Sequence, residues 1–84
     1  MENYGDKIQA AVISQINAEI AAAGMNKVEL AKKAGIPNST LARYLKGERD
    51  IPLPVFAGIA DALGITYVEL SARAQRRLEG KDVL

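Results

Sequence analysis

The stretch KVELAKKAGIPNSTLARYLK, residues 27–46, decides how this chain folds. Its first half carries apolar side chains at the spacing of one helix face. Gly35 follows at the point where a helix can end in the left-handed conformation that glycine adopts without strain. Pro37 then suits the opening turn of a second helix, because its φ angle is already fixed. We therefore predict two short helices joined by a tight corner.

The second of these helices, over residues 37–46, has one apolar and one polar face. Leu41 and Tyr44 recur at helical spacing and are expected to face the core. Leu45 extends that face, and it either packs against the next helix or takes part in a protein contact. The opposite side is a narrow strip without acidic groups, made of Asn38, Ser39, Ala42, Arg43 and Lys46. Hydrogen-bonding groups on so narrow a strip suit a nucleic-acid groove.

The composition excludes several kinds of chemistry. The 84 residues carry a formal net charge of +1 and are enough for one compact domain. Apolar residues make up 49% of the chain but aromatic ones only 5%, so we expect an aliphatic core. Because the chain has no cysteine and no histidine, it offers no disulfide, no Cys/His metal site and no imidazole to activate Ser39 or Ser71. We expect no enzymatic activity, no cofactor, no bound metal and no small-molecule ligand.

Nothing in the sequence indicates a membrane partner. The longest apolar run is far too short to cross a bilayer, and the chain does not open with the charged and apolar regions of a secretory signal. We therefore expect a cytoplasmic protein, in a bacterial cell or a phage-infected host.

Basic residues gather in two places. Residues 27–49 contain six basic and two acidic side chains, a local excess of four positive charges in a chain whose net charge is +1. A second cluster near the C-terminus consists of Arg73, Arg76 and Arg77. We interpret this second cluster as a solvated face or as the border of a protein interface, rather than as a DNA contact.

A long helix is predicted before the central pair. It runs from a cap at Asp6 to a stop at Gly24. Its apolar stripe consists of Ile8, Val12, Ile16 and Ile20, and its exposed side consists of Lys7, Gln9, Gln15, Asn17 and Glu19. Asn26 and Glu29 then have the spacing of a capping box for the helix that follows.

Two more helices are predicted after the central pair. The fourth begins between Pro52 and Pro54, where the first turn needs no amide donors, and ends at Gly64. Its buried stripe consists of Leu53, Phe56, Ile59, Ala60 and Leu63. Gly58, inside this helix, indicates close packing against another helix.

Thr66 and Glu69 have the spacing of a second capping box, which opens a fifth helix that continues toward Gly80. The residues expected to close the core from this helix are Tyr67, Val68, Leu70 and Ala74. No segment alternates apolar and polar residues as a strand does. We therefore predict a single all-α domain of five helices over residues 1–84, with a core of about 6–79, the helix pair at 27–46 and a tail at 80–84.

Across the predicted corner, small and apolar residues keep a definite order. They are Ala31, Ala34, Gly35, Ile36, Leu41 and Tyr44. This order resembles the helix-turn-helix of the phage repressor and Cro (XRE-like) family. The resemblance extends from about Met25 through GERDIP (47–52) to IADALGITYVEL (59–70), more than half of the chain. It implies a five-helix, lambda-repressor-like DNA-binding domain whose partner is double-stranded DNA.

Three side chains of the outward strip are candidates for contacts with bases. The planar guanidinium of Arg43 matches the paired acceptors of guanine, and the amide of Asn38 can pair with adenine in the same bidentate manner. The hydroxyl of Ser39 can bond to either base type. The resemblance also implies base contacts at these three positions. Ala42 and Leu45 depart from the family, whose members usually carry polar or acidic side chains there, so Ala42 can make only an apolar contact.

Four further residues are candidates for contacts with DNA phosphates. Lys27, at the start of its helix, can reach a phosphate that the backbone amides also accept. Lys46 and Arg49 resemble phosphate clamps, which set the register on DNA without reading its sequence. An alternative for Arg49 is an ion pair with the acid on either side of it. By resemblance, the position of Thr40 serves a phosphate or a helix cap.

These residues lead us to expect a sequence-specific transcriptional regulator, a phage or prophage repressor that docks residues 37–46 in the major groove of an operator and blocks transcription. So short a helix reads only a few base pairs. We therefore expect two copies on a two-fold site, with half-sites about 34 Å apart. No heptad seam is present, so any homodimer should be small and form on the DNA. The alternative is a protein-interaction module of the same fold, antitoxin-like or anti-repressor, that does not read DNA.

Overall fold

Five α-helices make up the described part of the chain. The computed structural model describes residues 3–80. Its elements are α1 (Tyr4–Ala22), α2 (Lys27–Ala34), α3 (Asn38–Leu45), α4 (Leu53–Ala62) and α5 (Tyr67–Leu78), and these residues contain no strand. The expected all-α class with five helices is confirmed for them. Residues 81–84 of the expected tail lie outside the described residues.

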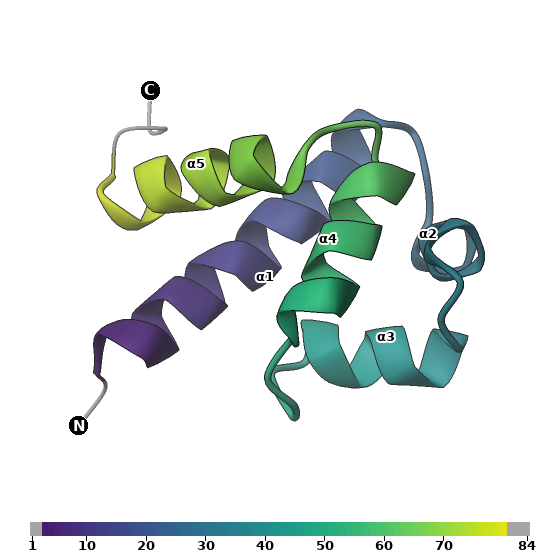
Figure 1. Ribbon diagram of the computed structural model, residues 1–84, viewed down its shortest axis with the longest axis horizontal. Helices are drawn as coiled ribbons and strands as arrows, with labels where there is room; N and C mark the ends of the chain where they lie inside the picture. The colour runs from purple at the N-terminus through teal and green to yellow at the C-terminus, as the bar shows by residue number, and fades with distance from the viewer. Residues whose placement is uncertain (1–2, 81–84) are drawn as a thin grey trace.

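The helices pack so that α3 lies at one end of the molecule. α1 packs along α5, α2 packs against α3 and α4, and α4 also contacts α5. Figure 1 shows α3 at the lower edge of the view, with α4 rising from its C-terminal end and α5 lying beside α1 on the far side from α2. One side of α3 is therefore supported by the other helices.

Each helix contributes one fully buried aliphatic side chain to a common core. These residues are Ile16, Leu30, Leu41, Ile59 and Leu70. Burying a side chain of this size stabilises a fold by about 1.5–3 kcal/mol, so the five residues together account for the way the helices meet. Phe56 joins this cluster, as do Ile20, Leu45 and Ala60. The aliphatic core expected from the composition is confirmed.

Hydrogen bonds at the helix starts confirm one predicted cap and correct two others. The capping box of α2 is complete, because Asn26 Oδ1 accepts from the amide of Glu29 at 2.8 Å and Glu29 Oε1 accepts from the amide of Asn26 at 3.1 Å. The cap of α1 is Asn3 rather than Asp6, since Asn3 Oδ1 accepts from the Asp6 amide at 2.9 Å. Asp6 instead lies in the first turn, where its negative charge suits the helix dipole.

The predicted second capping box is only half formed. Thr66 Oγ1 accepts from the amide of Glu69 at 3.0 Å, as expected. The carboxylate of Glu69 does not return to the amide of Thr66 but accepts a hydrogen bond from Arg73 at 2.8 Å. A charged guanidinium one turn further along the helix offers this carboxylate a stronger partner than a neutral amide does.

Side chains predicted to be solvated instead join α1 to α5. Arg73 donates to both carboxylate oxygens of Glu19 at 2.8 Å, and Arg77 Nε donates to Gln15 Oε1 at 3.0 Å. Gln15 is buried and donates to Glu19 at 2.7 Å. The predicted exposure of Gln15 and Glu19 was therefore wrong. Of the C-terminal arginines, Arg73 is half-buried in this contact, whereas Arg76 and Arg77 are exposed as a solvated face requires. Polar groups that a single helix would leave in water find partners where two helices meet.

Three apolar side chains assigned to the core are exposed. Leu53 is 66% exposed, Val68 62% and Tyr67 50%. All three lie in the first turn of their helices, where the apolar face runs beyond the atoms that could cover it. Leu70 and Ala74 are fully buried, as predicted.

Within residues 3–80, no single helix is both long enough and apolar enough to cross a membrane. α4 and α5 satisfy the criteria of length and composition only when taken together, as a pair bent by 98°.

Candidate nucleic-acid interface

The corner between α2 and α3 is closed by its own backbone. Gly35 adopts a φ of 73°, the left-handed conformation predicted for it. The chain then turns back so that the amide of Ile36 donates to the carbonyl of Ala31 at 3.0 Å, and Ile36 packs against the core. Pro37 is the N-cap of α3, which begins one residue later than predicted, at Asn38. This corner fixes the direction in which α3 leaves α2.

The inward face of α3 is buried as predicted. Leu41 is fully buried, Tyr44 is 4% exposed and Leu45 is 9% exposed. The burial of Leu45 decides between its two interpretations, because a side chain that belongs to the core is not available to a protein partner. α3 is thus held by three adjacent side chains.

The candidate base-contacting residues lie together on the opposite side of α3. Asn38, Ser39 and Arg43 are exposed, and Ala42 between them is half-buried. At 3.6 residues per turn these positions share one arc of the helix surface. An α-helix with its side chains is about 10–12 Å across, so α3 can enter the major groove, which is about 12 Å wide. The arrangement can present a guanidinium, an amide and a hydroxyl to base edges at one time.

The candidate phosphate-contacting residues border this arc. Lys27 is the exposed first residue of α2, and Lys46 is the exposed C-cap of α3. Thr40 is half-buried, and its amide donates to the carbonyl of Pro37 at 3.0 Å. Lys27 stands apart from the others, which all belong to the segment 38–49.

Arg49 is positioned by an aromatic ring rather than by an acid. Its guanidinium carbon lies 5.7 Å from the centroid of the Tyr44 ring, and it forms no ion pair with Glu48 or Asp50. Its carbonyl oxygen accepts a hydrogen bond from Gln9 Nε2 of α1 at 3.3 Å. The loop after α3 is therefore tied to α1, and the alternative of a local ion pair is ruled out. Sequence reasoning missed both Tyr44 and Gln9 in this role, because their spacing from Arg49 follows no local rule.

The charges of the molecule are divided between two regions. The ion pairs of Arg73 with Glu19 and of Arg73 and Arg76 with Glu69 all lie on α1 and α5. By contrast, the cationic side chains of the interface form no ion pair within residues 3–80. They are Lys27, Arg43, Lys46 and Arg49. The interface therefore carries uncompensated positive charge, as a surface that meets a phosphate backbone requires.

Comparison with known families agrees with this geometry. A family model described as a helix-turn-helix, which includes the XRE-like and Cro-type proteins, matches residues 16–70. The matched region begins inside α1, contains α2, α3 and α4 whole, and ends inside α5. No curated protein and no solved structure gives a significant match to the chain.

Proposed function

The chain belongs to the XRE-like helix-turn-helix family of DNA-binding regulators, and from this premise we propose that it is a sequence-specific transcriptional repressor of phage or prophage type. Its membership makes double-stranded DNA its partner. The family is one of regulators and not typically of enzymes. The proposal adds which residues read the DNA, how the protein acts on a promoter and where it does so.

One observation carries the proposal: the exposed arc of α3 presents donors and acceptors without any acidic group. In the proposed complex, Arg43 makes a bidentate contact with guanine, Asn38 pairs with adenine, and Ser39 bonds to a neighbouring base. The half-buried Ala42 contributes an apolar contact, for which the methyl group of thymine is the natural partner.

The phosphates on either side of the groove are held by the residues that border this arc. Lys46 and Arg49 contact the backbone beyond the C-terminal end of α3, and Thr40 adds a neutral hydrogen bond. Lys27 contacts a phosphate from the start of α2. These contacts set the register of α3 on the duplex and supply the salt-dependent part of the affinity.

The repressor would act by occupying a promoter in place of polymerase. Because α3 reads only a few base pairs, two copies bind a two-fold operator, with half-sites about 34 Å apart. The site of action is the DNA of a bacterial cytoplasm, in a lysogen or an infected host.

The protein-interaction alternative has lost one of the features that favoured it. That alternative depended in part on an outward Leu45, and Leu45 is part of the core. The half-buried Ala42 remains compatible with either function. No other feature of α3 favours a protein over DNA as its partner.

The experiment that tests the proposal is selection of bound duplexes from a random-sequence DNA pool at near-physiological salt, since affinity depends on the salt concentration. We expect an enriched inverted repeat. A single enriched half-site would support base reading but not a paired operator, and the absence of enrichment would contradict sequence-specific binding. Placing the selected site across a reporter promoter then tests repression. We expect lower reporter expression when the protein is present.

A further inference from the structure

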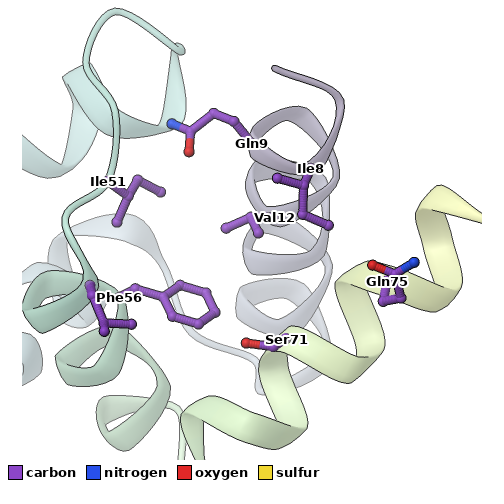
Figure 2. A pocket seen from close by; sticks show the side chains of 8 residues that line it. Ile8, Gln9, Val12, Ile51, Phe56, Ser71 and Gln75 are labelled. Carbon is purple, nitrogen blue, oxygen red and sulfur yellow. The ribbon is translucent and has the colours of Figure 1, made fainter. Parts of the chain in front are cut away.

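The side of the molecule where α1, α4 and α5 meet contains an apolar hollow of about 300 Å³. Figure 2 shows side chains from all three helices, and from the loop before α4, arranged around it. They are Ile8, Gln9, Val12, Ile51, Leu53, Phe56, Ser71 and Gln75. None of these residues carries a charge. We refer to this feature as the α1–α4–α5 hollow.

The hollow is a continuation of the core that residues 3–80 leave uncovered. The apolar stripe of α1 repeats every four residues, and its second half, Ile16 and Ile20, is buried. Its first half, Ile8 and Val12, is only half-buried and lines the hollow. Apolar side chains that the other helices leave partly exposed form a surface to which another molecule can bind.

Exposed apolar side chains stand at the rim of the hollow. Leu53 lines it and yet is 66% exposed. Tyr4 is 61% exposed, and its hydroxyl donates at 2.8 Å to Oε1 of Gln75, a lining residue. One patch of the surface therefore combines a protruding leucine with an apolar hollow beside it.

We propose that this patch binds the same patch on a second copy of the chain, with Leu53 of each copy entering the hollow of the other. A two-fold contact needs a self-complementary surface, in which each copy supplies both the inserted group and the site that receives it. Because no charged side chain lines the hollow, two identical patches meet there without like-charge repulsion. This inference rests on the proposed function, which requires two copies on one operator.

The hollow adjoins the proposed DNA interface. Ile51 and Leu53 follow the loop that contains Arg49, and Gln9, another lining residue, donates to the carbonyl of Arg49 at 3.3 Å. Figure 1 shows that α4 starts beside the C-terminal end of α3. The contact therefore sets the two copies of α3 on either side of the two-fold axis, with their C-terminal ends nearer to it.

The size of the patch indicates under which conditions two copies associate. Stable interfaces bury about 800 Å² on each partner, and one leucine with its hollow supplies only part of such an area. We expect a weak association in free solution that becomes effective when neighbouring half-sites hold two copies close together. The coupling between the half-sites should then raise the affinity by about 5- to 150-fold.

The test uses duplexes with one and with two selected half-sites and three variants of the full chain. Leu53→Gln removes the inserted apolar group, and Ser71→Leu fills the hollow from α5. Val68→Gln is the matched control, because Val68 is 62% exposed and does not line the hollow. We expect the first two variants to lose the cooperative binding to two half-sites and to keep the affinity for one. The control should retain both properties.

Several outcomes would overturn the proposal. Full cooperativity in both Leu53→Gln and Ser71→Leu would place the contact on another surface, and wild-type binding without cooperativity would exclude the contact. If no duplex binds at all, the proposed function fails. The contact between two copies is then tested without DNA. Raising the protein to millimolar concentration should then shift the amide resonances of the lining residues in the wild type but not in Leu53→Gln. Equal shifts in both proteins, or none in either, would refute the contact.

Discussion

Two arginines close together in the chain show how one side-chain type serves two purposes. Arg43 extends from the exposed arc of α3 and forms no ion pair within residues 3–80, so its guanidinium is available to a base edge. Arg49 is held over the ring of Tyr44, and the backbone beside it is tied to α1 by Gln9. We assign the extended arginine to sequence reading and the stacked one to a phosphate.

Replacing Arg43 by alanine should relax the sequence preference at one base pair. Loss of a bidentate contact with guanine is expected to cost on the order of 1–3 kcal/mol on the selected site. Titrations against duplexes that differ at single positions measure this effect. Lys33→Ala is the control, since Lys33 is an exposed cation of α2 outside the arc of α3. A loss for Arg43→Ala that is equal on every duplex would argue against base reading.

At the scale of elements, glycine serves different purposes at the corner between α2 and α3 and in the interior of α4. Gly35 has a φ of 73°, which costs other residues roughly 1–2 kcal/mol. Gly58 lies inside α4, and a Cβ built there would be 3.9 Å from the carbonyl oxygen of Ala34, an ordinary contact. The close packing predicted at Gly58 therefore leaves room for a methyl group.

Alanine should consequently have opposite effects at these two positions. Gly58→Ala is expected to stabilise the fold by about 0.5–1 kcal/mol, because alanine favours a helix interior. Gly35→Ala is expected to destabilise it by about 1 kcal/mol or more. Chemical denaturation of both variants measures the change in unfolding free energy. A destabilising Gly58→Ala would contradict the ordinary contact that a Cβ makes with Ala34.

The ion pair of Glu69 with Arg73, one turn apart on α5, predicts a loss of stability in acid. A hydrogen bond from Arg73 is the main reason that the pKa of Glu69 lies below its usual value of 4.5, although partial burial opposes it. Because the folded pKa is the lower one, the stabilising contribution is complete above pH 4.5 and disappears as the pH falls through the folded value. Glu69→Gln should lower the unfolding free energy at neutral pH and make its decrease in acid shallower. Glu48→Gln, which alters an exposed acid without an ion pair, should leave the acid dependence unchanged.

The elements themselves were largely predictable, because caps, glycines and apolar spacing act within a few residues. The box of Asn26 and Glu29 and the turn at Gly35 are examples. The ion pair of Glu19 with Arg73 was not predictable, since these residues are 54 positions apart and meet only when α5 lies on α1. Leu53 was misassigned for a related reason. Its spacing fits the buried face of α4, but its side chain stands beside the hollow and is left 66% exposed by residues 3–80.

In the candidate interface, the inward and outward sides of α3 followed from its periodicity, as the buried Leu41 and exposed Arg43 show. The stacking of Arg49 on Tyr44 did not follow, because it depends on the path of the loop after the helix. The hollow could not be predicted from the sequence pattern either. A stripe on α1 shows which residues are apolar, but not how much of their surface the other helices cover.

At the scale of the whole molecule, the net charge of +1 hides a strong division. Acidic and basic side chains are paired on α1 and α5, while the cations of α2, α3 and the following loop have no acidic partner within residues 3–80. The molecule therefore presents one basic end, which contains α3, and an electrically balanced body behind it. Such a division favours one orientation on approach to DNA.

This division predicts the salt dependence of binding. If Lys27, Lys46 and Arg49 each neutralise one phosphate, log K should fall with log salt concentration with a slope of about −3 for each bound copy. Lys46→Ala and Arg49→Ala should each reduce the magnitude of the slope by about one and weaken binding to all sequences. Binding isotherms at several salt concentrations provide the slope, with Arg77→Ala as a control on the balanced body. An unchanged slope would remove the mutated residue from the set of phosphate contacts.

We propose above all that DNA binds to the exposed arc of α3 and its bordering cations. The most direct measurement is a titration of the isotopically labelled chain with a selected half-site duplex, followed through the amide resonances. We expect the largest shifts in α3, at the start of α2 and in the loop that contains Arg49, with α5 little affected. Shifts centred on α5, or a uniform weak response over the whole chain, would contradict it.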